Sequence, residues 1–78
     1  MADDNGPLSR AILSLLVAAD QRCPAIIGQA HLLYHSRSSL QSPTAAKTLA
    51  QLKRDAADLI RAIANVEAAM KRAGLDPT

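Results

Sequence analysis

The chain has 78 residues, enough for one small domain, and short chains bury a smaller fraction of their surface than long ones. Alanine and leucine dominate and Tyr34 is the single aromatic residue, a composition that favours helices over a β-sheet. Nine basic and seven acidic side chains leave a net charge of +2, too balanced to predict binding to nucleic acid or membranes by charge alone.

Residues 1–6 are predicted to form a flexible tail ahead of a single helical domain, 7–75. Asp3 and Asp4 stand where a secretory signal carries basic residues. The longest apolar run, 11–19, is far shorter than a membrane span. We therefore expect a soluble, cytoplasmic protein with no membrane partner.

A first helix is predicted over about 8–36, with Gly6 as its N-cap and Pro7 as its first residue. Pro24 lies inside this helix, where a proline removes one backbone hydrogen bond and clashes with the preceding turn. The spacing of the apolar residues also slips between Ala19 and Cys23. The two features predict a kink or a break near Pro24, giving one bent helix or two abutting helices.

The apolar residues of the first helix form two stripes. The stripe expected to face the second helix consists of Leu8, Ile12, Leu15, Ala19, Cys23, Ile26, Ala30 and Leu33. The other lies one residue further on, so the two stripes together make an apolar arc wider than one neighbouring helix can cover. The surplus, predicted to bind a partner, consists of Leu13, Leu16, Val17, Ile27 and Tyr34. Tyr34 either anchors that contact or closes one end of the domain.

A second helix is predicted over about 43–73. Ser42 and Pro43 form an N-cap and first-turn signature, and Gly74 followed by Leu75 predicts a Schellman motif at the C-terminus. The apolar residues alternate in steps of three and four, as in a coiled coil. This stripe, expected to pack against the first helix, consists of Leu49, Leu52, Ala56, Leu59, Ile63, Val66, Met70 and Ala73.

The two predicted helices have nearly equal lengths and are joined by a short polar segment, 36–42, in which Leu40 is expected to contact the core. This layout predicts an all-α antiparallel helical hairpin. Its stability margin is thin, and Cys23, the single cysteine and a predicted buried thiol, closes no disulfide within the chain. We therefore expect oligomerisation or a partner to complete the core.

Two pairs of polar residues were candidates for chemistry, and each has a simpler explanation. His31 and His35 lie four residues apart on a helix but have no third ligand nearby in sequence, so no metal site is predicted. Asp55 and Asp58 alternate with basic residues and are interpreted as solvated charges on the polar face of the second helix.

Lys47, Arg54 and Arg61 recur every seven residues and form a line that could follow a phosphate backbone. Interspersed acids weaken its field and no stacking aromatic accompanies it, so nucleic-acid binding is disfavoured. An all-helical mutase with charges inside a dimeric bundle is also disfavoured, because Arg10 and Arg22 are placed toward the polar side of the first helix. No cofactor and no small-molecule substrate is evident.

The sequence thus predicts a non-enzymatic protein–protein interaction module, a small adaptor or co-chaperone that binds a partner through the surplus of its first helix. In size and layout, with a second helix that starts at Pro43, the chain resembles the two-helix co-chaperones of type III secretion needle subunits; the resemblance covers architecture only. The alternatives are a homodimeric four-helix bundle with a regulatory or structural role, which could contact nucleic acid, and a minor component of a phage or secretion assembly.

Overall fold

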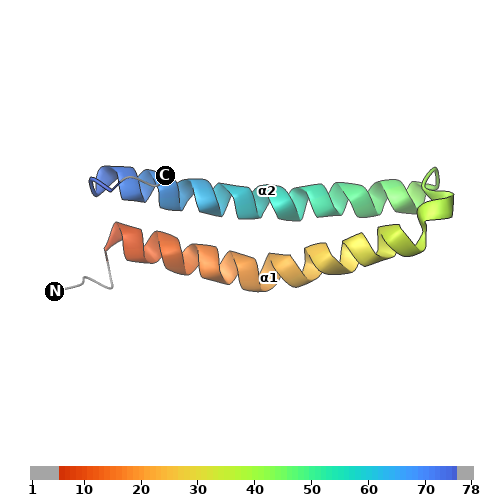
Figure 1. Ribbon diagram of the computed structural model, residues 1–78, viewed down its shortest axis with the longest axis horizontal. Coiled ribbons are helices and arrows are strands. Elements are labelled where there is room, and N and C mark those ends of the chain that lie inside the picture. Colours follow the sequence, from red (N-terminus) through yellow and green to blue (C-terminus); the bar gives the residue numbers. More distant parts are fainter. Residues whose placement is uncertain (1–5, 76–78) are drawn as a thin grey trace.

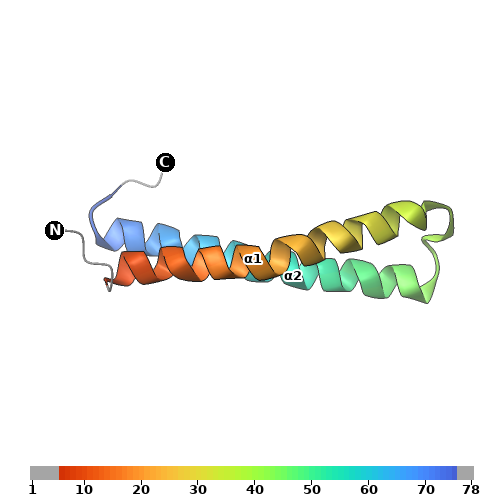
Figure 2. The ribbon, with the colours of Figure 1, turned by 90° about the horizontal axis from the view of Figure 1, so that it is seen from below.

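The structure is a computed structural model and describes residues 6–75. Two long helices, α1 (Pro7–His35) and α2 (Pro43–Arg72), run antiparallel, and a 3-10 helix, η1 (Arg37–Ser39), lies between them in the chain. Figure 1 shows the helices side by side, and Figure 2 shows them crossing at a shallow angle. The rod measures 55 × 19 × 16 Å. The predicted all-α antiparallel hairpin is confirmed, and the helix bounds lie within one residue of those predicted.

The ends of α2 are capped as the sequence predicts. The Ser42 hydroxyl oxygen accepts a hydrogen bond from the Ala45 backbone N–H at 3.2 Å. At the other end Gly74 has a φ of 80°, and the Leu75 N–H donates to the Met70 carbonyl at 2.8 Å. These contacts form a Schellman motif that ends the helix.

The connection between the helices is held by its backbone. The Ser39 N–H donates to the Ser36 carbonyl at 2.8 Å, and the Ser42 N–H donates to the Ser39 carbonyl at 3.1 Å. Leu40, which was expected to contact the core, is 52% exposed. That expectation is wrong: the two successive turns closed by these hydrogen bonds leave the Leu40 side chain on the outside of the connection.

α1 continues without interruption through Pro24. The structure therefore has one helix here and not two abutting helices, while a kink at Pro24 stays a prediction. Asp20 and Pro24 are both exposed, so the turn in which the proline removes one helical hydrogen bond lies at the surface of the hairpin. The tail predicted for residues 1–6 lies outside the described residues except for Gly6, which is the N-cap of α1.

α1 is the more apolar of the two helices, yet none of its residues is buried. Its most apolar stretch has a mean hydropathy of 1.4, so by length and composition alone α1 could cross a membrane. The run 11–19 by itself did not reveal this property. A helix that is covered by another protein can have the same length and composition as a membrane-spanning helix. The positions of the charged side chains on α1 help to distinguish the two.

Small side chains build most of the contact between the helices. The half-buried and buried positions of α2 that follow one another in steps of three and four are Ala45, Thr48, Leu52, Asp55, Leu59, Ala62, Val66 and Ala69. The matching half-buried positions of α1 are Leu8, Ala11, Leu15, Ala18, Arg22, Ala25 and Gln29. We refer to these two sets as the contact seam. Its alanines allow the helix axes to approach closely, but they bury little apolar surface.

The contact seam is rotated relative to the stripes predicted from the sequence. Leu49 and Ile63, expected to face α1, are 49% and 44% exposed, and Ile12, expected to face α2, is 50% exposed. The seam instead includes Asp55, which finds polar partners such as Arg22 across the interface. Alanine spacing and this polar match decide which faces meet, and the larger aliphatic side chains are left outside.

Candidate functional site

The five side chains predicted to bind a partner all lie away from the contact seam. Their exposed fractions are 58% for Leu13, 58% for Leu16, 46% for Val17, 58% for Ile27 and 62% for Tyr34. We refer to these five as the outward surface of α1. All five are more exposed than the residues of the contact seam. The hairpin by itself therefore leaves this part of α1 in water.

The outward surface has two parts. Leu13, Leu16 and Val17 lie within five residues of one another, in the first half of α1. Ile27 and Tyr34 lie in the second half, where they line a shallow hollow together with Ala30 and His31. Asp20 and Pro24 separate the two parts and are themselves exposed. The outward surface thus consists of two apolar patches, which are separated by Asp20 and Pro24.

Tyr34 is held in place from the connection side. The Arg37 guanidinium carbon lies 4.2 Å from the centre of the Tyr34 ring, and Arg37 donates a hydrogen bond to the Tyr34 carbonyl at 2.8 Å. A cation over an aromatic face is attracted to it, which restricts the ring without burying it. Tyr34 is therefore not packed between the helices: it contacts Arg37 and, at 6.1 Å between ring centres, His35, and it stays 62% exposed.

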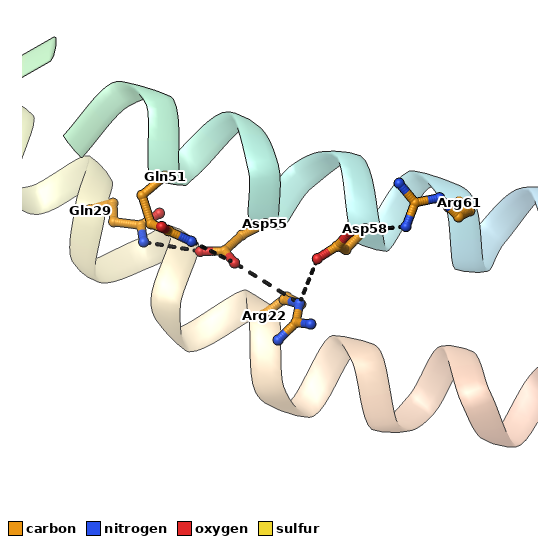
Figure 3. A network of polar contacts seen from close by, with 6 residues as sticks. All are labelled: Arg22, Gln29, Gln51, Asp55, Asp58 and Arg61. Carbon is orange, nitrogen blue, oxygen red and sulfur yellow. Dashed lines mark hydrogen bonds and ion pairs between the residues drawn. The ribbon is translucent and has the colours of Figure 1, made fainter. Parts of the chain in front are cut away.

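A polar network crosses the contact seam near the middle of the hairpin, as Figure 3 shows. Asp55 of α2 is 7% exposed. Its Oδ2 atom accepts a hydrogen bond from Gln29 Nε2 of α1 at 3.0 Å, and its Oδ1 atom accepts one from Gln51 Nε2 at 3.3 Å. Arg22 Nε of α1 lies 3.9 Å from Asp55 Oδ1. Three side chains thus gather around one buried carboxylate.

The interpretation of Asp55 as a solvated charge is therefore wrong, and so is the placement of Arg22 on the polar side of α1. Both lie in the contact seam, where each has a partner on the opposite helix: Asp55 contacts Gln29 and Arg22, and Arg22 contacts Asp55. Asp58 fits the earlier interpretation better, since its side chain is 38% exposed and pairs with Arg61 at 3.0 Å on the surface. Arg22 Nε also lies 3.3 Å from Asp58 Oδ2, so this one arginine joins both acids.

The network is suited to fixing the register of the two helices. Each cation in it is paired with an acid of the same chain, and a buried charge that has lost its partner is costly, so sliding one helix past the other is disfavoured. Two polar atoms of the network, Gln29 Oε1 and Arg22 Nε, are buried without a well-aligned hydrogen bond. Because it joins side chains of both helices, we refer to this network as the interhelical lock.

The other polar candidates do not assemble into a metal site among the described residues. The rings of His31 and His35 stack with their centres 6.3 Å apart, and within residues 6–75 no group of three potential metal ligands occurs. Cys23 is half-buried and free. In the basic line, Lys47 and Arg54 are exposed, while Arg61 is bound to Asp58.

An exposed apolar surface on α2 was missed from the sequence. Leu49, Ile60 and Ile63 are 49%, 65% and 44% exposed. The sequence contains a second series of apolar residues in steps of three and four, which begins at Leu49. This series overlaps the one that was predicted to face α1, so the two were not separated. Comparisons with protein-family models, with curated proteins and with solved structures find no match to the chain.

Proposed function

We propose that the chain is a non-enzymatic protein–protein interaction module, in the manner of a small adaptor or co-chaperone, and that it binds a protein partner through the outward surface of α1. The exposure of five large apolar side chains on one helix supports the proposal. Each such side chain left in water forgoes about 1.5–3 kcal/mol of burial. Exposed apolar patches on soluble proteins mark contact sites.

A protein partner accounts for α1 better than a lipid bilayer does. Asp20 and Arg22 stand near the middle of the helix, where a charged side chain costs about 2.5–3.5 kcal/mol in a membrane. Arg22 is also tied to α2, a helix whose outer face carries Lys47, Arg54 and Arg61. Crossing a bilayer would require these pairs to separate or the charges to enter the membrane.

The test uses affinity purification of the tagged full chain from its native cells, followed by stoichiometric quantification of what binds. A variant carrying Leu13→Asp and Ile27→Asp places a charge in each apolar patch. Ser14→Asp is the matched control, because Ser14 is an exposed residue of the same helix outside the outward surface. Circular dichroism of each variant confirms that the helices are retained.

The proposal expects a partner in a fixed ratio with the wild type and with Ser14→Asp, and at least about a tenfold loss with the double variant. Retention of the partner by the double variant would show that the outward surface is not the contact. Equal loss with Ser14→Asp would show that the effect of charge is unspecific, and it would also count against the proposal.

A further inference from the structure

α2 carries a second heptad series beside its contact seam. In steps of four and three it comprises Leu49, Lys53, Ala56, Ile60, Ile63, Glu67 and Met70. Five of these residues are exposed and the other two, Ala56 and Met70, are half-buried. We refer to this series as the α2 flank. Such spacing is what one helix presents to another along its length, and among residues 6–75 nothing buries its five exposed members.

α1 carries a matching series, which we refer to as the α1 flank. It comprises Ser9, Ile12, Leu16, Ala19, Cys23, Ile26, Ala30 and Leu33. In both helices the flank follows the contact seam in the same rotational sense. Because the helices run in opposite directions and face each other through the seam, the two flanks lie on the same side of the hairpin. The opposite side carries the polar residues that accompany the network, including Gln51 and Asp58.

The α2 flank is complementary to itself when reversed. Lys53 and Glu67 each lie seven residues from Ile60, in opposite directions. A second α2 packed antiparallel about Ile60 therefore sets Lys53 of each copy level with Glu67 of the other. The same reversal brings Leu49 to within one residue of the level of Met70, and Ala56 to within one residue of the level of Ile63. Lys53 and Glu67 are both exposed, and neither has an ion pair with another described residue of its own chain.

The α1 flank obeys the same symmetry about the same point. Arg22 reaches both Asp55 and Asp58, so Ala19, three residues earlier in α1, lies level with the part of α2 near Ile60. A two-fold axis at that height brings Ile12 of one copy to Ile26 of the other. All of the larger members of this flank are apolar, so no charge is buried without a partner there.

The flanks extend along most of both helices. They run from Ser9 to Leu33 in α1 and from Leu49 to Met70 in α2, about 30–36 Å at 1.5 Å per residue. A standard interface buries roughly 800 Å² on each partner. A second hairpin laid on the two flanks completes a four-helix bundle, in which every neighbouring pair of helices is antiparallel.

We propose that the occupant of the two flanks is a second copy of this chain, related by a two-fold axis that passes between the Ile60 residues, with reciprocal pairs between Lys53 and Glu67. This goes beyond the proposed function, because Leu13, Val17, Ile27 and Tyr34 of the outward surface lie outside the flanks. Leu16 alone belongs to both. A dimer thus keeps a surface on each copy for a different partner.

The test measures the dimer dissociation constant of the full chain by sedimentation equilibrium. Lys53→Glu and Glu67→Lys each create two like-charge contacts per dimer and are expected to raise the constant at least about tenfold. Lys47→Glu is the matched control, with the same change of charge on the outer face of α2, and is expected to change it less than about threefold. An equimolar mixture of Lys53→Glu and Glu67→Lys chains is expected to form a heterodimer as stable as the wild type.

A wild type that stays monomeric, a loss equal to that of the control, or failure of the mixture to associate would each overturn the proposal. A second measurement does not depend on charge. With Cys23→Ser as background, Ile60→Cys is expected to form a disulfide-linked dimer on oxidation, and Ala50→Cys on the outer face is not. Equal crosslinking of the two variants would contradict the axis. Binding of a different protein to the outward surface of α1 is a separate outcome, which does not depend on whether the chain dimerises.

Discussion

Removal of the Asp55 carboxylate tests the interhelical lock. Asp55→Ala deletes an acceptor that is 7% exposed and that Gln29 Nε2 reaches at 3.0 Å. A hydrogen bond to a charged group contributes about 1.5–3 kcal/mol, and the variant leaves a buried amide unpaired as well. The Arg22 contact adds less, because it is 3.9 Å long and the Arg22 side chain is 36% exposed.

Two gains offset part of this loss. Alanine favours the helix over aspartate by roughly 0.5 kcal/mol, and the carboxylate no longer has to leave water. We therefore expect Asp55→Ala to lower the free energy of unfolding by about 2 kcal/mol. Asp58→Ala is the matched control: its side chain is 38% exposed, and we expect a loss below about 1 kcal/mol.

The assay is urea unfolding followed by far-ultraviolet circular dichroism, with all chains at one concentration because the stability of the proposed dimer would depend on concentration. The midpoint for Asp55→Ala should fall clearly below that for Asp58→Ala. Equal midpoints for the two variants, or a stability for Asp55→Ala equal to that of the wild type, would refute the view that the buried carboxylate holds the helices in register.

Three further substitutions test local features in the same assay. Gly74→Ala should cost about 1 kcal/mol because the φ of 80° strains any residue with a Cβ, although nothing lies within 4 Å of the added atom; an unchanged midpoint would contradict the Schellman motif. Ser42→Ala should cost about 1 kcal/mol through loss of the 3.2 Å cap, whereas Ser42→Asp should cost little. Pro24→Ala should stabilise the chain by roughly 1–3 kcal/mol by restoring a helical hydrogen bond at an exposed site, and a loss of stability would mean that the proline shapes the packing.

The hairpin and its caps were predictable because their signals are local. Proline at the first helical position, serine before it and glycine after the last turn act within four residues of where they stand. The structure confirms Ser42 as the N-cap and Gly74 as the terminating glycine. Equal helix lengths with a short connection leave little choice other than an antiparallel pair.

The contact face was not predictable from apolar spacing alone, because α2 carries two overlapping heptad series. Large aliphatic residues such as Leu49 and Ile63 gave one series the stronger signal, but the structure places them outside. The series that meets α1 is identified by its alanines and by the match of Asp55 with Arg22 and Gln29, which involves residues distant in sequence. Only a joint reading of both helices could have revealed it.

Leu13 and the other residues of the outward surface were predicted to be exposed because α1 has more apolar side chains than one helix can cover. The number of uncovered apolar side chains is larger than predicted. The contact seam buries three alanines and Asp55, so Ile12, Leu49 and Ile60 also remain uncovered. A hairpin whose interior is mostly alanine has more apolar surface outside than a pattern of large residues suggests. This is why we assign two surfaces, one for a second copy and one for a different protein.

The central claim is that folding of this hairpin is linked to association. Thermal unfolding of the purified full chain, followed by circular dichroism over a hundredfold range of concentration, tests it most directly. For a dimer of two chains of 78 residues, the midpoint should rise on the order of 10 °C across that range. A sharp transition with a midpoint that does not change with concentration would contradict the account, because the hairpin would then be stable alone.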